Sequence, residues 1–341
     1  MNRRQFLAAG ASLTAVFAQS KLDVRPGIDL FSIRDSGWTP FEYLDYCGKL
    51  GAKVVHFSEI RFVGSLETEH LKKVRAHAES LGIQCEIGMR SICPSSTMFD
   101  PKQGAAEEQL TRMIAAAVAI GSPIVRAVLG SMDDRNPPGI DGHIEDSVKV
   151  LRACRTRALD SGIKIAIENH AGDMQARELK TLVEEAGKDF VGVCLDSGNP
   201  LWTIEDPHLT LETLHPYVLT SHVRDTAVWA VPEGAAVQWV RMGDGNIGID
   251  SYVRKYSELC AGRALSLEII VTQPRVFPYR KPVFWERYRT TPAWEFERFA
   301  ALVDDGKPRP PQPAPAKENA AQLQREDLEA SFAYTKKLIN S

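Results

Sequence analysis

The chain lacks the features that mark disulfide-stabilised, nucleic-acid-binding or dinucleotide-binding proteins. Its six cysteines lie far apart and form no C-x-x-C pair, which argues against a zinc knuckle and a small disulfide framework. Basic residues form no long run and the formal net charge is −3, so no nucleic-acid partner is expected. No G-x-G-x-x-G follows the first β-type segment. What remains is an ordinary globular composition, with 44% hydrophobic and 25% charged residues in a chain long enough for a large α/β domain.

The first twenty residues resemble a bacterial export signal. Arg3 and Arg4 precede an apolar stretch over 6–18, and V-F-A before Gln19 fits a signal-peptidase site. The stretch is shorter than the roughly 20 residues of a stable membrane span, so we expect none. N-R-R-Q-F-L stands near the twin-arginine pattern. We therefore expect residues 1–20 to be a signal peptide, the twin-arginine export machinery to be a partner, and the mature protein to be periplasmic or otherwise exported. The alternative is a chance basic start on a disordered tail.

Short apolar segments of β type alternate with amphipathic helical patterns from residue 22 onward. Several helical patterns end on a glycine two or three residues before the next segment, which is a common helix stop. Eight β-then-α units predict a (β/α)8 TIM barrel over residues 22–275, and a doubly wound open sheet is the alternative. The β-type segments are 27–33, 53–59, 83–89, 124–129, 163–169, 190–196, 217–223 and 264–270.

Two regions depart from this alternation. Residues 224–247 form a long predicted loop that carries Trp229 and Trp239, as a substrate cover would. From residue 276 the chain is dense in aromatics and arginine, and a proline-rich linker then precedes a last helical stretch at 318–339. We expect residues 276–341 to be a C-terminal extension that packs against the barrel or a neighbouring subunit, which leaves a homo-oligomer open.

Four polar residues have the same orientation in four successive β-type segments. Side chains alternate along a strand, so Glu168, Asp196, His222 and Glu268 face away from the bulky apolar residues of their segments. A barrel strand packs its bulky face on the helices, so these four residues point to the barrel axis near the C-terminal strand ends, where barrel active sites lie. The alternative is four unrelated strand-end polar residues.

Three carboxylates and one imidazole on one axis would repel one another without a positive partner. A divalent cation meets this need, and oxygen-rich ligation with one histidine favours Mn²⁺, Mg²⁺ or Co²⁺ over a structural zinc.

These motifs resemble the sugar phosphate isomerase/epimerase group of the xylose isomerase-like TIM barrel superfamily. The matching segments are AIENH, CLDSGN, SHVRD and LEII, in that order, and 241–256 resembles the group's G-x-G-x-I-x-(F/Y) segment. The resemblance covers about residues 25–272. It implies that one divalent metal ion, Mn²⁺ before Mg²⁺, Co²⁺ or Zn²⁺, is bound by the four polar residues Glu168, Asp196, His222 and Glu268.

The resemblance also implies a reaction. The metal would bind a carbonyl and a neighbouring hydroxyl of a keto-sugar, with Glu168 and Glu268 on opposite faces of the adjacent carbon. One glutamate removes the C–H proton to give an enediolate, and the site of proton return decides between epimerisation and isomerisation. We therefore expect an isomerase or epimerase. The runner-up is a lyase that eliminates a group from a 3-keto-glycoside or dehydrates its substrate.

Three further residues are expected to bind the substrate: His170, Asn199 and Arg224. Asn199 stands where ketose epimerases carry a histidine three residues after the metal aspartate. Arg224 is suited to a substrate hydroxyl or an oxyanion, and His170 either binds substrate or orients Glu168. Weaker pocket candidates are Glu59, Arg126, Trp38 and Trp229.

Two other functions are weaker hypotheses. The endonuclease branch of the superfamily, which cuts DNA at abasic positions, needs more histidines than this chain supplies, and Asn199 occupies one of their positions. A non-catalytic exported sugar-binding protein is the second, and an intact metal quartet argues against it. Because sugar phosphates are largely confined to the cytoplasm, export favours a free or glycosidic keto-sugar.

Overall fold

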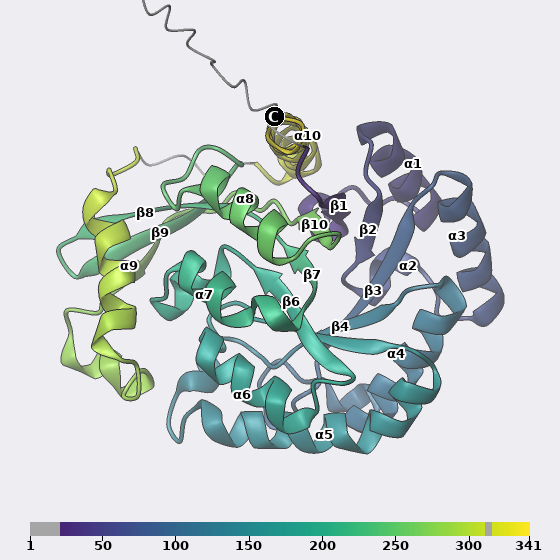
Figure 1. The fold of residues 1–341 in the computed structure, drawn as a ribbon, viewed down its shortest axis with the longest axis horizontal. Helices are drawn as coiled ribbons and strands as arrows, with labels where there is room; N and C mark the ends of the chain where they lie inside the picture. Colours follow the sequence, from purple (N-terminus) through teal and green to yellow (C-terminus); the bar gives the residue numbers. More distant parts are fainter. Residues whose placement is uncertain (1–20, 311–315) are drawn as a thin grey trace, which may run out of the picture.

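A computed structural model describes residues 21–310 and 316–341 (Figure 1). The expected signal peptide, residues 1–20, lies outside the described residues. No helix in the described ranges is both long and apolar enough to cross a bilayer.

Eight parallel strands form the central sheet, in the order β10-β1-β2-β3-β4-β5-β6-β7. A parallel bridge between Val223 and Leu267 brings the two outer strands together, with a hydrogen bond of 2.7 Å from Val223 N to Ser266 O. The (β/α)8 barrel predicted from the sequence is therefore confirmed. The strands are β1 Arg25–Asp29, β2 Val54–Phe57, β3 Gln84–Ser91, β4 Ile124–Val128, β5 Lys164–Glu168, β6 Val191–Asp196, β7 Val218–His222 and β10 Ala264–Leu267.

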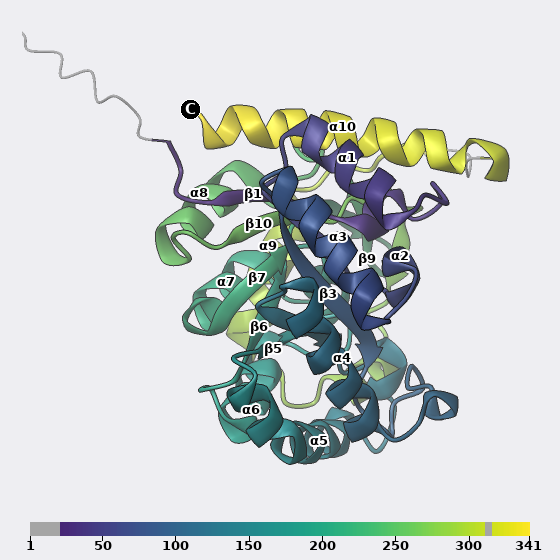
Figure 2. The ribbon, with the colours of Figure 1, turned by 90° about the vertical axis from the view of Figure 1, so that its right-hand side faces the viewer.

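Helices surround this sheet on its outer side (Figures 1 and 2). The first of them shows how local sequence sets the boundaries: Thr39 and Glu42 form a capping box, Pro40 occupies the first turn, and Gly51 ends the helix at a φ of 93°. The surrounding helices are α1 Pro40–Leu50, α2 Ile60–Val63, α3 Thr68–Ser80, α4 Ala106–Ile120, α5 Ile140–Asp160, α6 Ala176–Ala186, α7 Pro207–Leu214 and α8 Ile249–Leu259.

Strand β5 illustrates how the barrel positions its polar side chains. Ile165 and Ile167 are fully buried in the large apolar cluster that joins the strands to the helices. Ala166 belongs to a separate small cluster with Ile124 and Cys194. Because side chains alternate along a strand, Glu168 shares the side of Ala166 and points into the barrel.

The predicted loop over 224–247 is wrong. This segment contains an antiparallel hairpin, β8 Asp225–Val231 and β9 Gly234–Val240, which β11 Arg275–Phe277 extends to three strands. Its residues alternate in the period of a strand. Trp229, which is 5% exposed, packs within the hairpin, whereas Trp239, which is 7% exposed, lines a cavity at the C-terminal end of the barrel.

The C-terminal residues pack against the barrel of their own chain. Helix α9, Ala293–Asp305, lies along the hairpin, where Asn246 Nδ2 donates to Leu302 O over 3.0 Å. Helix α10, Ala320–Ile339, lies across the end of the molecule that also holds α1 (Figure 2). Tyr46 donates to Glu329 in this helix over 2.9 Å.

Candidate active site

The four predicted metal ligands meet inside the barrel at the C-terminal ends of neighbouring strands. Carboxylate oxygens of Glu168, Asp196 and Glu268 lie within 4.8 Å of one another. The Nδ1 atom of His222 lies 3.0 Å from a Glu168 oxygen and 3.5 Å from a Glu268 oxygen. The first three residues in chain order have no exposed surface, whereas Glu268 is 6% exposed. The structure therefore brings the whole predicted set together.

Arg224 places a positive charge between two of these carboxylates. Its Nη2 atom donates to both Asp196 Oδ2 and Glu268 Oε2. The guanidinium lies over the ring of Trp239, 4.4 Å from the centroid, and the side chain is 2% exposed. A Cβ atom at Gly198 would lie 2.5 Å from Arg224 Cγ, so the glycine leaves room for the arginine. Arg224 thus contacts two predicted ligands directly.

A second arginine neutralises Glu168. Arg126, from β4, donates from Nε to Glu168 Oε2 over 2.5 Å. Burial would raise the pKa of Glu168, but Arg126 and His222 outweigh it and hold the pKa well below its ordinary value. Burial would likewise lower the pKa of His222, but Glu168 and Asp29 raise it. Glu168 is therefore a carboxylate at neutral pH.

Asn199 and His170 lie beside this set in different ways. The Asn199 amide donates from Nδ2 to Glu168 Oε1 over 3.2 Å, and its backbone N–H donates to Asp196 Oδ1 over 2.7 Å. Asn199 therefore holds two of the carboxylates in place. The Nδ1 atom of His170 lies 2.8 Å from the carbonyl oxygen of Gly130, which can only accept, so Nδ1 carries the proton.

Burial lowers the pKa of His170 to about 4, so its imidazole is neutral at neutral pH. With the proton on Nδ1, the Nε2 atom is a hydrogen-bond acceptor.

A cavity of about 230 Å³ opens beside the carboxylates at the C-terminal end of the barrel. The expected substrate ligands line it, together with one of the two glutamates, whereas Glu168, Asp196 and His222 lie behind its wall. Trp38 and Trp229 are not part of the lining. The ring of Trp38 packs instead against the ring of Tyr46, with 5.1 Å between the ring centroids. Expected residues in the lining are Glu59, Arg126, His170, Asn199, Arg224 and Glu268.

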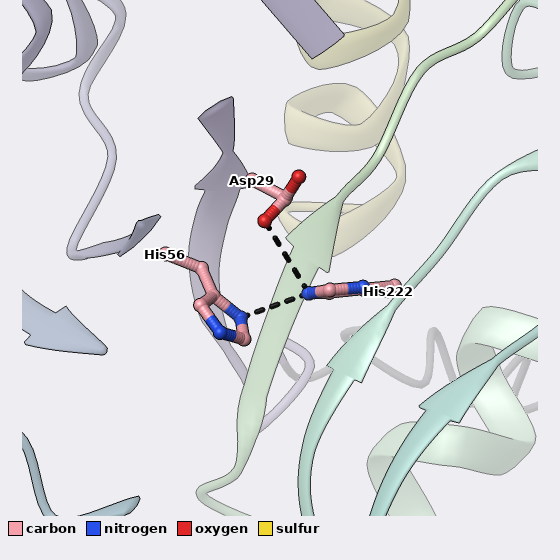
Figure 3. A group of neighbouring side chains, drawn as sticks. All are labelled: Asp29, His56 and His222. Atoms are coloured by element: carbon pink, nitrogen blue, oxygen red, sulfur yellow. Dashed lines mark hydrogen bonds and ion pairs between the residues drawn. The ribbon is translucent and has the colours of Figure 1, made fainter. Parts of the chain in front are cut away.

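A buried polar layer behind His222 was missed by the sequence analysis (Figure 3). Asp29, His56 and Glu86 come from β1, β2 and β3, where the strand register places them side by side. All three are at most 1% exposed. Each is a polar residue that faces inward from an otherwise apolar segment. The side-chain alternation that predicts an inward Glu168 therefore also predicts inward side chains at these three positions.

His222 joins this layer to the carboxylates. Its Nε2 atom lies 2.8 Å from His56 Nδ1 and 3.5 Å from Asp29 Oδ2. Burial, with His222 and Arg126, lowers the pKa of His56 well below its ordinary value, so His56 is neutral. Burial raises the pKa of Asp29 and of Glu86, and Glu86 accepts from Thr220 over 2.6 Å. The layer therefore fixes the Nε2 side of His222 inside the barrel.

The donor set fits a divalent cation. Three hard carboxylate donors and one imidazole nitrogen converge, which suits ions that take oxygen ligands with one histidine. His222 Nδ1 is buried, faces Glu168, and has no hydrogen-bond partner among the residues that the structure describes. A bound cation would compete with Arg224 for the carboxylates of Asp196 and Glu268. Arg224 would then have to withdraw from the oxygens to which it now donates.

Comparison with known proteins agrees with this geometry. A family model described as xylose isomerase-like TIM barrel matches residues 44–285. The 3-oxo-isoapionate decarboxylase of Pectobacterium atrosepticum is 25% identical over 184 residues, which are 54% of this chain and 60% of the relative. The match thus spans less than two thirds of that relative's length.

Two solved structures show the same fold. A D-psicose 3-epimerase determined in the presence of D-fructose has a TM-score of 0.60 at 17% identity and covers 93% of this chain and 100% of its own. The IOLI protein with a binding zinc atom has a TM-score of 0.55 at 15% identity and covers 91% of this chain and 99% of its own.

Proposed function

The chain belongs to the xylose isomerase-like TIM barrel family, and on that basis we propose that it is a divalent-metal-dependent isomerase or epimerase of a keto-sugar. The convergence of Glu168, Asp196, His222 and Glu268 beside a cavity of about 230 Å³ carries this proposal. A cluster of strand-end carboxylates with perturbed pKa values, open to a pocket, is the kind of site at which enzymes move protons.

In the proposed reaction, Glu268 removes the proton from the carbon beside the substrate carbonyl, because it lines the cavity and is partly accessible. A divalent ion, Mn²⁺ in our proposal, held by the four ligands would polarise the carbonyl when bound. Epimerisation returns a proton to the opposite face, and Glu168, which is ionised in the resting site, would first take that proton from solvent. Return to the neighbouring carbon gives isomerisation.

The side chains around the two glutamates have supporting roles in this proposal. Arg224, once released from the carboxylates, donates to the oxygen on which negative charge develops. His170 accepts from a substrate hydroxyl through Nε2, because its Nδ1 proton is bound to Gly130. Asn199 keeps Glu168 and Asp196 in place.

A lyase is the second candidate function, and the similarity to a 3-oxo-isoapionate decarboxylase favours it. Loss of carbon dioxide beside a carbonyl leaves the same enediolate as loss of a proton. The same set of residues would then protonate that carbon.

We also propose that the protein is exported by the twin-arginine route and acts outside the cytoplasm. The paired arginines and the apolar stretch within residues 1–20 support this proposal. Fractionation of cells that express the full chain, with Arg3 and Arg4 changed to Lys as the comparison, tests it. Equal distribution of both chains would contradict export by this route.

The catalytic proposal is tested by hydrogen exchange. The purified protein is assayed for bound metal and then incubated in D₂O with a panel of ketoses, 3-keto-glycosides and keto-sugar acids. We expect deuterium at the carbon next to the carbonyl, and loss of exchange after chelation. Release of carbon dioxide or an aglycone would assign a lyase, and absence of both metal binding and exchange would overturn the proposal.

A further inference from the structure

Three arginines stand at the mouth of the barrel, and their partners differ. Arg126 is bound to Glu168, and Arg224 is bound to Asp196 and Glu268. Arg90 lies near the end of β3 and lines the same cavity. No hydrogen bond or ion pair joins Arg90 to any residue in the ranges 21–310 and 316–341, so its charge is available to a ligand.

Arg90 also stands between two cavities. It lines both the cavity beside Glu268, about 230 Å³, and a second cavity of about 270 Å³. Glu59 lines both as well, but its carboxylate is paired with Arg61. Arg90 lies at the C-terminal end of β3, beyond Gly88, where the register with β4 shifts. Arg90 is therefore directed to the mouth of the barrel and is exposed there.

Asp100, an acid that lines the second cavity together with Arg90, has other partners. Its pKa is lowered first by a hydrogen bond from Gln103 and then by the backbone N–H of Lys102, with Arg90 a smaller contribution. The Gln103 amide lies 3.0 Å from Asp100 Oδ2. Asp100 does not form an ion pair with Arg90, so it leaves the guanidinium free to bind an anion at the cavity.

From this arrangement we infer that Arg90 binds a carboxylate group of the substrate, and that the substrate is an acidic keto-sugar. The inference rests on the proposed function, because it places this group in the cavity that holds Glu268. A guanidinium binds a carboxylate through two parallel hydrogen bonds, which gives both affinity and orientation. The curated relative named for 3-oxo-isoapionate also acts on a compound whose name denotes a carboxylate.

The carboxylate bound by Arg90 fixes which end of the sugar faces the proton-transfer groups. Glu268 and Arg90 line one cavity, so a substrate held at Arg90 presents its other carbons to Glu268. When a neutral sugar binds, the exposed guanidinium of Arg90 stays hydrated, so binding costs no desolvation of this group. The neutral sugar, however, is not oriented by Arg90. Arg90 is thus a specificity-determining residue for acidic over neutral substrates.

The test uses matched substrates with one skeleton: a keto-sugar acid, the neutral sugar with a hydroxymethyl group in place of the carboxylate, and the phosphate ester of that neutral sugar. Wild-type protein, Arg90→Gln and Arg90→Lys are compared by deuterium exchange and by kcat and KM. For Arg90→Gln we expect KM for the acid to rise about 30-fold, as for a lost charged hydrogen bond, with the neutral sugar unchanged. Arg90→Lys should recover part of the loss.

The control is Arg61→Gln, because Arg61 lines only the second cavity and is already paired with Glu59. If Arg90→Gln has the same ratio of kcat/KM for the acid to kcat/KM for the neutral sugar as the wild-type protein, the inference is overturned and the proposed function is left intact. Preference of the wild-type protein for the phosphate ester would overturn the carboxylate assignment.

A binding measurement separates the two proposals when no substrate exchanges. Titration calorimetry of the metal-loaded protein with gluconate, which cannot react, should give binding that Arg90→Gln weakens at least about tenfold. If gluconate binds in this way and no sugar exchanges, the proposed function fails and the anion site stands. If gluconate binds equally to both proteins, the anion site is wrong.

Discussion

Arg224 donates to Glu268 from the same nitrogen, Nη2, that donates to Asp196. Both carboxylates belong to the predicted metal set, so a side chain of the protein itself offsets their charges in this state. Buried carboxylates without a positive partner are costly, and a guanidinium meets that need. A divalent cation held by these carboxylates would therefore compete with Arg224 for the same oxygens.

We expect Arg224→Met to bind Mn²⁺ about tenfold more tightly than the wild-type protein, which is equivalent to about 1.4 kcal/mol. The metal-free variant should unfold at a lower temperature, because Asp196 and Glu268 lose their partner. Titration calorimetry on chelator-treated protein measures the first effect, and scanning calorimetry measures the second. Arg90→Met is the matched control, since Arg90 contacts no predicted ligand. Unchanged or weaker metal binding in Arg224→Met would contradict the competition.

Replacement of either glutamate should remove proton exchange. We expect Glu268→Gln and Glu168→Gln each to slow deuterium exchange by about a thousandfold, the usual size of a general base contribution. Mass spectrometry of the recovered sugar measures the exchange, and metal analysis shows how much of the loss follows from weaker ligation. Glu59→Gln is the control, because Glu59 lines the same cavity but is paired with Arg61. Full activity in both variants would mean that other groups transfer the proton.

We expect His56 to affect metal binding through its contact with His222. The two nitrogens are 2.8 Å apart, so a proton on His222 Nε2 donated to His56 leaves Nδ1 free to face the carboxylates. We expect His56→Leu to weaken metal binding by about tenfold, as seen when such supporting partners are lost. Nitrogen NMR of labelled histidine reports whether His222 changes its protonated nitrogen.

The matched control for His56 is His77→Leu, because His77 also pairs with a side chain at 2.8 Å but lies on the surface in α3. Metal binding should be unaffected there. Two metal ions per chain in the wild-type protein would show instead that Asp29, His56 and His222 form a second ion site.

The succession of eight β-type and helical segments predicted the barrel, and side-chain alternation within four of its strands predicted that the four expected ligands converge. Glu168, Asp196, His222 and Glu268 each stand opposite a bulky apolar face, and a parallel barrel brings strand ends together without further information. The same rule applied to the first three strands would have revealed Asp29, His56 and Glu86.

Other features depend on contacts between distant segments. The ion pair of Arg224 with Glu268 depends on the space that Gly198 leaves and on packing against Trp239, and neither is a pattern in sequence. The hairpin over β8 and β9 was mistaken for a loop because its two strands pair with each other and with β11, outside the barrel repeat.

Glu205 gives a pH dependence that is independent of the metal site. It is 2% exposed and accepts from the backbone N–H of Ala176, at the start of α6, and from the Thr210 hydroxyl over 2.6 Å. Burial raises its pKa from 4.5 to about 7. Between these values the folded chain binds a proton that the unfolded chain has lost, so this residue's contribution to stability falls as pH rises.

We therefore expect Glu205→Gln, which cannot ionise, to gain stability relative to the wild-type protein by about 3 kcal/mol between about pH 5 and about pH 8. Urea unfolding of both proteins at each pH measures this difference. Glu212→Gln is the control: hydrogen bonds from Arg298, with Lys255, hold the pKa of Glu212 at about 2, so it is ionised in both folded and unfolded chains over this range. Its effect on stability should not vary with pH. A constant difference for Glu205→Gln as well would mean that Glu205 is already ionised in the folded protein at pH 5.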